Sequence, residues 1–160
     1  MRPHNARLLR NLDDVRKEFV ETVSSIKDEE MDYAPAQGMK SYRALFQEIG
    51  TMEKLCTSWL AEENFLEWDM SAYAPSKTLQ SGLSELDSIR AETKAYLDSA
   101  SEEKLETAID VPGPWQQYMG TQVEPEEVVR WIAQHEYYHL GQIISYRWIQ
   151  GHDPYAGEGK

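Results

Sequence analysis

Four segments of this chain repeat an apolar residue every three or four positions over about 20 residues, the spacing of a helix with one buried face. No segment alternates apolar and polar residues as a convincing strand would. Amphipathic helices of similar length bury their faces best against one another. The sequence therefore predicts an all-α fold, an antiparallel four-helix bundle. The positions behind this prediction are Leu8, Leu12, Val15, Phe19, Val23 and Ile26; Leu45, Met52, Leu55 and Trp59; Leu79, Leu83, Leu86, Thr93 and Leu97; and Val128 with Trp131 or Ile132.

The residues at the ends of these segments are typical of helix termini. The first segment stops before the proline and glycine of residues 32–38, DYAPAQG. Ser41 is a good N-cap for the second segment, which we expect to end near Glu63. Pro125 suits the first position of the fourth helix, and Gly151 suits the position just beyond its end.

Two connections are longer than a simple turn. Residues 64–77 carry aromatic side chains and a proline, and residues 101–124 are too rich in proline and glycine to be wholly helical. We expect both to fold over one end of the bundle. No repeat or internal boundary is evident, so residues 1–160 are expected to form one domain with a flexible tail from about 152 to 160.

The charge of the chain limits its partners. Sixteen Lys and Arg stand against 28 Asp and Glu, a formal net charge of −12, and no basic cluster offsets it. Such a surface repels nucleic-acid phosphates and anionic membranes, so neither is an expected partner. No apolar run is long enough to span a membrane. A single cysteine, Cys56, fits a reducing compartment, and we expect a cytoplasmic protein.

The motif HEYYH at residues 135–139 points to a metal. His135 and His139 lie four apart, so they project from one face of the fourth helix and can reach a common ion. The alternative is a pair of partly buried histidines that only hydrogen-bond to neighbours. The motif also matches the H-E-x-x-H pattern of zinc peptidases. That interpretation is disfavoured because only 21 residues follow His139 and Ser145 stands where an extended motif needs its third histidine.

Glu48 is a candidate third ligand on the second helix. It lies three residues after Leu45 and four before Met52, within the apolar face. A buried carboxylate needs a cation or strong donors, because burying it alone costs several kcal/mol. Either a metal shared with the two histidines or a salt bridge to a lysine or arginine near the bundle end would satisfy it. Three protein ligands would leave coordination positions open, as catalytic metal sites do.

Two stretches of this sequence resemble the DinB/YfiT-like family of metal-binding four-helix bundles. WIAQHEYYHLGQI, residues 131–143, resembles the fourth-helix signature of the family, in which H-x-x-x-H is followed by one residue and Gly-Gln. SYRALFQEIG, residues 41–50, resembles the second-helix motif, a serine with an inward ligand seven residues later. Helix order and length agree over nearly the whole chain. Members usually carry histidine at that ligand position, whereas this chain carries Glu48.

The resemblance implies a divalent metal held by Glu48, His135 and His139, with zinc or nickel favoured. A carboxylate ligand also makes manganese or ferrous iron acceptable. It further implies action on a small-molecule substrate, either metal-dependent hydrolysis or transfer with a low-molecular-weight thiol such as bacillithiol or mycothiol. A non-catalytic, stress-related bundle that binds metal or a protein partner is the alternative.

Catalytic residues are not evident from the motifs. Glu136 and Tyr138 are the candidates for an acid or base beside the metal. Other expectations concern the walls and surface: Cys56 is expected to be a buried, inert thiol, and ordinary packing is the alternative for every aromatic. Residues expected to line or cover the pocket are Tyr137, Tyr138, Gln142, Tyr118, Trp115 and Trp68; those expected to contribute to a homodimer are Tyr146, Trp148 and Ile149.

Overall fold

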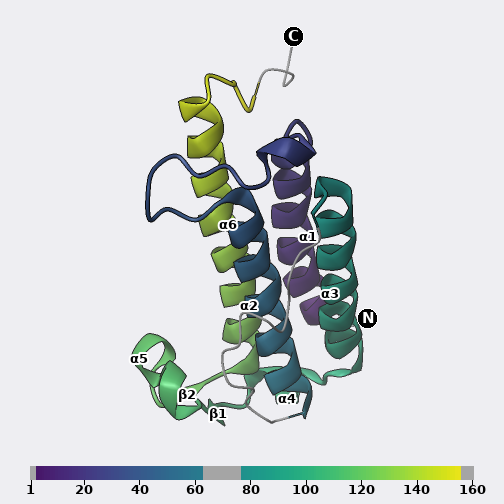
Figure 1. Cartoon of the computed structure of the whole chain (residues 1–160). Helices are drawn as coiled ribbons and strands as arrows, with labels where there is room; N and C mark the ends of the chain where they lie inside the picture. The colour runs from purple at the N-terminus through teal and green to yellow at the C-terminus, as the bar shows by residue number, and fades with distance from the viewer. Residues whose placement is uncertain (1–2, 63–76, 156–160) are drawn as a thin grey trace.

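A computed structural model describes residues 3–62 and 77–155, and it confirms an all-α four-helix bundle (Figure 1). The four long helices carry most of the regular structure. None of the helices in the described ranges is long and apolar enough to cross a membrane. The bundle helices are α1, Pro3–Val23; α2, Tyr42–Glu62; α3, Leu79–Ser99; and α6, Pro125–Ile149.

The predicted helix ends agree closely with the structure. The Ser41 hydroxyl accepts a hydrogen bond from the Ala44 amide (3.3 Å), as an N-cap does. Pro125 occupies the first turn of α6. Gly151 follows α6 with φ of +79°, a left-handed conformation that glycine adopts at little cost. The first helix ends at Val23, so Ile26 is buried outside it.

Neighbouring helices α2 and α3 run in the same direction. Glu53 meets Arg90 (Oε1 to Nε, 2.6 Å), and one turn further along both helices Thr57 meets Thr93 (hydroxyl oxygens, 2.8 Å). Since both partners advance together, the two helices are parallel, and the end of α2 and the beginning of α3 lie at opposite ends of the bundle (Figure 1).

Helices α1 and α6 form a second parallel pair. His4 meets Glu126 near their beginnings, and Arg16 meets Glu136 further along. Two helices therefore run each way, but their order along the chain is up, down, down, up rather than strict alternation (Figure 1). Hydrophobic spacing identifies the buried face of a helix and carries no information on the direction of its neighbour, so the sequence did not predict this order.

Residues 101–124 form a small cap at the lower end of the bundle (Figure 1). The expectation of no strands was wrong here, because two strands of two residues each are too short to show any alternation. They pair antiparallel with Ile109 opposite Val123. The other long connection, together with Trp68, lies outside the described residues, as does the tail beyond residue 155. The short elements are η1, Asp28–Glu30; α4, Glu102–Glu106; β1, Ile109–Asp110; η3, Gly113–Trp115; α5, Gln116–Met119; and β2, Gln122–Val123.

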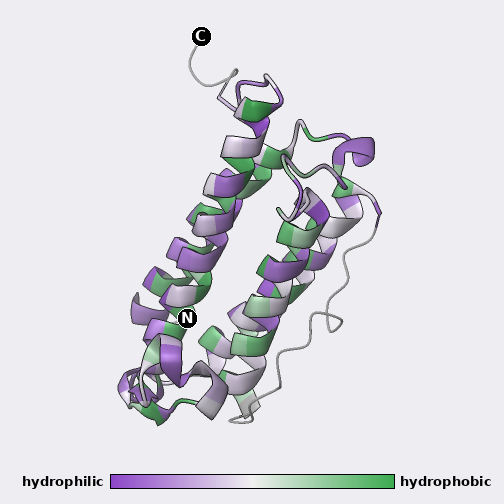
Figure 2. Ribbon diagram, turned by 60° about the vertical axis from the view of Figure 1, so that its left-hand side comes forward, coloured by the Kyte–Doolittle hydropathy of each residue, from purple (hydrophilic) through white to green (hydrophobic). Residues whose placement is uncertain are grey.

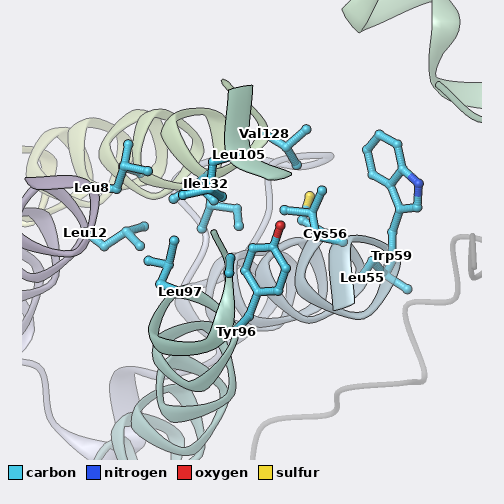
Figure 3. Close-up of a cluster of buried hydrophobic side chains, with 14 of the residues drawn as sticks. Leu8, Leu12, Leu55, Cys56, Trp59, Tyr96, Leu97, Leu105, Val128 and Ile132 are labelled. Carbon is cyan, nitrogen blue, oxygen red and sulfur yellow. The ribbon is translucent and has the colours of Figure 1, made fainter. Parts of the chain in front are cut away.

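The apolar core consists of two clusters, one toward each end of the bundle. Hydrophobic residues recur along every long helix (Figure 2). The cluster near the cap gathers side chains from all four long helices, including Leu12, Trp59, Leu97 and Ile132 (Figure 3). The other cluster includes Phe19 and Phe46, whose ring centroids are 5.0 Å apart.

A charged layer separates the two clusters: Arg16, Glu53, Arg90 and Glu136, one residue from each long helix, all at most 7% exposed. Arg90 bonds both carboxylates, Glu53 at 2.6 Å and Glu136 at 2.7 Å. Arg16 bonds Glu136 at 2.5 Å and Glu53 at 3.2 Å. The Thr93 hydroxyl adds a bond to Glu53 (2.8 Å). Two positive and two negative charges thus neutralise one another within the bundle, which makes their burial tolerable.

Candidate metal centre

A pocket of about 760 Å³ opens on the face between α2 and α6. One rim is formed by residues 38–40, in the connection before α2, and the other by residues 114–118 of the cap. Both rims lie on the same side of the bundle, the left side in Figure 1. The helices supply the walls and floor, with these lining residues: Glu48, Met52, Trp131, His135, Tyr138, His139, Gln142 and Tyr146.

Glu48, His135 and His139 meet in this pocket. The Nε2 atoms of the two histidines are 3.1 Å apart, and His139 Nε2 is 3.6 Å from Glu48 Oε2. All three ligand atoms lie within 4.8 Å of one another. Two ligands each about 2.1 Å from one ion at the tetrahedral angle would be about 3.4 Å apart. The separations therefore suit ligands of a single metal ion.

Gln142 fixes the orientation of His139. Its Oε1 is 2.7 Å from His139 Nδ1, and a carbonyl oxygen can only accept, so Nδ1 carries the proton. The lone pair of Nε2 then faces the pocket, as a metal ligand requires. Gln142 in turn donates from Nε2 to the Tyr138 hydroxyl (3.2 Å). These two hydrogen bonds, from His139 to Gln142 and from Gln142 to Tyr138, thus hold the His139 ring with Nε2 toward the pocket.

Both histidines are poised to be neutral near pH 7. Burial, reinforced by the neighbouring His139, lowers the pKa of His135 from 6.5 to about 4. Burial also lowers the pKa of His139, against the opposing influence of its bond to Gln142 and of the Glu48 charge. A neutral imidazole has one unprotonated ring nitrogen, so the two histidines can bind a cation without a net loss of protons.

Glu48 is less deeply placed than its spacing suggested. Its side chain is 17% exposed and points into the pocket on the flank of α2, while Leu45 and Ile49 fill the core beside it. The Lys40 ammonium contacts Glu48 Oε2. The salt bridge considered as the alternative to metal ligation is therefore present, on the same carboxylate that faces the histidines.

The buried face of α6 is rotated relative to the predicted one. Ile132, Glu136, Leu140 and Ile143 point into the core, whereas His135 is half-buried at the pocket. Glu136 does not line the pocket: its carboxylate is 1% exposed and is bonded by both arginines of the charged layer. Glu136 therefore lies in the core, outside the pocket lining, and a catalytic role for it stays a prediction.

The other predicted pocket residues divide into two groups. Tyr138, 63% exposed, and Tyr118, 71% exposed, line the pocket with their rings at its rim, while Tyr137 is exposed and does not line it. Trp115 is buried at the pocket edge, with its ring centroid 5.9 Å from that of Trp131. The cap therefore contributes Trp115 to the pocket lining, and the same ring packs in the core cluster, which was the alternative for this residue.

Cys56 and two of the three residues suggested for a dimer contact, Trp148 and Ile149, lie outside the pocket lining. Cys56 is fully buried, and burial raises its thiol pKa well above the ordinary value, as expected for an inert thiol. Tyr146 is only 3% exposed, so the prediction that it contributes to a subunit contact was wrong. Trp148 and Ile149 are more than half exposed, and a dimer through them stays a prediction.

Comparison with known proteins supports the same fold. The sequence profile described as the DinB superfamily matches residues 11–143. Among curated proteins no sequence matches this chain. A DinB-like protein of Bacillus subtilis, YjoA, superposes with a TM-score of 0.69 at 20% identity, over 91% of this chain and 92% of that one. A conserved protein from Enterococcus faecalis superposes with a TM-score of 0.70 at 21% identity, over 94% and 99%.

A third solved structure carries a functional description of its own. YfiT from Bacillus subtilis, described as a probable metal-dependent hydrolase with an unusual four-helix bundle topology, superposes with a TM-score of 0.72. The identity is 15%, over 96% of this chain and 91% of YfiT. At these identities the superpositions establish the shared fold.

Proposed function

The chain belongs to the DinB superfamily, and from this premise we propose that it is a divalent-metal-dependent hydrolase acting on a small molecule. One observation carries the proposal: Glu48, His135 and His139 place three ligand atoms within 4.8 Å of one another in a pocket. The description of YfiT, which shares the fold, as a probable metal-dependent hydrolase points the same way.

The donor set suits a catalytic metal. Two neutral imidazoles and one carboxylate form a three-ligand set of the kind that leaves positions open for water or substrate. A divalent ion held by these three residues would supply Lewis acidity and would lower the pKa of bound water. The contribution of the chain is to hold His139 through Gln142 and to keep both histidines neutral. Zinc or nickel is the favoured ion, and the carboxylate also suits manganese or ferrous iron.

The pocket walls favour a small substrate with an apolar part. A volume of about 760 Å³ is in the usual range for small-molecule sites. Trp115, Trp131 and Met52 supply apolar surface, and the exposed Tyr138 hydroxyl lies one hydrogen bond from Gln142. Tyr138 is therefore our candidate for moving a proton at the reacting group. A low-molecular-weight thiol in place of water is the alternative nucleophile.

Elemental analysis of untagged, dialysed protein tests the centre directly. The parent should carry metal near one equivalent, and Glu48→Ala and His139→Ala should lose it. His152→Ala is the matched control, because His152 is 52% exposed and lies outside the pocket lining. A parent that stays empty after incubation with zinc, nickel, manganese and anaerobic ferrous iron would contradict the proposal.

The loaded protein should then be screened against ester, amide and lactone substrates, with and without added thiols. Hydrolysis that disappears in His139→Ala and persists in His152→Ala supports the proposed activity. Turnover only with an added thiol would assign the transferase activity instead. Stoichiometric metal without turnover on any of these classes would favour the non-catalytic alternative.

A further inference from the structure

Lys40 contacts the same carboxylate oxygen that faces the candidate metal ligands. Its ammonium lies against Glu48 Oε2, and this oxygen is 3.6 Å from His139 Nε2. A metal ion held by the three ligands would be a cation bound to that oxygen, and the lysine ammonium is a second cation that contacts the same oxygen. Because like charges repel and one oxygen has limited lone pairs, occupancy by one cation disfavours the other.

The surroundings of Lys40 allow its ammonium to leave. Its side chain is 51% exposed, and it belongs to the connection before α2 rather than to a helix. Gly38, two residues earlier, has φ of +85° and nothing within 4 Å of the position a Cβ would take. The lysine can therefore exchange Glu48 for water without disturbing packed core residues.

Lys40 has no second acidic partner within the pocket. Among the described lining residues, Glu48 is the single carboxylate and Lys40 the single lysine or arginine. Without a metal, the lysine is the one cationic side chain lining the pocket that can neutralise Glu48. Its charge also acts on both histidines, whose pKa values it helps to lower.

We propose that Lys40 is a built-in competitor of the metal: it occupies Glu48 in the metal-free protein and is displaced from Oε2 when a divalent ion binds. This inference rests on the proposed metal centre. Lys40 is a positioning residue in this scheme, since it acts through Glu48. It makes the affinity of the site for metal lower than the three ligands alone would give, and its displacement leaves a free ammonium at the pocket rim.

Titration calorimetry with Zn²⁺ on the metal-free protein tests the competition. Exposed or half-exposed ion pairs typically shift an equilibrium constant by roughly two- to fivefold. Lys40→Gln should therefore bind Zn²⁺ about two- to fivefold more tightly than the parent, and Lys40→Ala should show the same gain. Lys40→Arg keeps a cation against Glu48 and should restore the affinity of the parent. Lys17→Gln is the charge-matched control, because Lys17 is 76% exposed on α1 and pairs only loosely with Glu21 (3.9 Å).

The possible outcomes separate the two ideas. Equal or weaker binding by Lys40→Gln and Lys40→Ala would overturn the competition, since the lysine would then be neutral toward the metal or would support its ligand. An equal gain in Lys17→Gln would overturn it too, because net charge alone would explain the effect. No binding of Zn²⁺, nickel, manganese or ferrous iron by the parent would refute the metal centre and with it the proposed function, whereas binding without a gain in the lysine variants refutes the role of Lys40 alone. Circular dichroism of each variant verifies that the bundle is folded.

Discussion

Replacing Arg90 with methionine should destabilise the bundle strongly. Arg90 donates to Glu53 through two nitrogens (2.6 and 3.2 Å), to Glu136 (2.7 Å) and to the Leu12 carbonyl (2.7 Å). Methionine fills much of the same volume but offers none of these bonds. Two buried carboxylates would then share one arginine, Arg16, and the charged layer would carry an unbalanced negative charge.

The expected loss of unfolding free energy depends on the hydrogen-bond partners that Glu53 and Glu136 retain. Removing one partner of a buried ion pair usually costs about 3–5 kcal/mol. Glu53 retains Arg16 and the Thr93 hydroxyl, and Glu136 retains two bonds from Arg16. We therefore expect a loss of about 3–4 kcal/mol, a large share of the roughly 5–15 kcal/mol that stabilises a typical domain.

Urea unfolding followed by circular dichroism measures this loss. Lys94→Met on the same helix is the control: position 94 is exposed, so its effect should stay within about 0.5 kcal/mol. Adding Glu136→Gln to Arg90→Met restores charge balance, and the double variant should be about 1–3 kcal/mol more stable than the sum of the single effects. A loss below about 1 kcal/mol for Arg90→Met, or strictly additive effects, would refute the view that charge balance in this layer is needed.

Three further predictions concern the site and its surroundings. Gln142→Leu should weaken metal binding by roughly 10- to 100-fold in calorimetry, because it removes the partner that orients His139; unchanged affinity would count against that role. In the metal-free protein, the free energy of unfolding should fall as the pH drops below 6.5. His135 takes up a proton near pH 6.5 in the unfolded chain, whereas in the folded protein its pKa is about 4. His135→Gln should make the free energy of unfolding less dependent on pH in urea titrations at pH 7, 6 and 5. The same pH dependence in the variant and the parent would contradict the role of His135. The buried Cys56 thiol should resist a disulfide reagent until the protein is unfolded; rapid labelling of native protein would show otherwise.

Much of the fold could be read from the sequence because its helix signals are local. Ser41, Pro125 and Gly151 stand at helix ends for reasons that involve only their own backbone and first neighbours. The two parallel helix pairs could not be predicted, because the direction of each helix depends on the end of the bundle at which the preceding long connection finishes. The strands at Ile109 and Val123 were missed since two residues carry no period.

The candidate site was predictable to the extent that helical spacing defines it. His135 and His139 face together because they are four apart, and Glu48 was noticed as a polar residue among apolar ones. Lys40 was missed because it precedes α2, where no periodicity relates it to Glu48.

The charged layer was missed for a different reason. Arg16 lies between Leu12 and Phe19 at helical spacing, and Glu136 lies between Ile132 and Leu140. Each would have been visible as a polar residue on a buried face. The charged layer becomes evident only when one such residue is sought on every helix and their charges are summed. The two arginines then balance the two glutamates.

The division of the pocket between helices and loops has a consequence for how this protein can change. Its ligand atoms come from α2 and α6, which are anchored in the core, and its rims come from residues 38–40 and 114–118. No described lining residue belongs to α1 or α3. New substrates could therefore be accommodated by altering two surface segments while the metal ligands and half of the bundle stay untouched. In the proposed function, the metal ligands therefore stay on the helices while the rims of the pocket lie on segments that can vary, an arrangement suited both to natural divergence and to engineering.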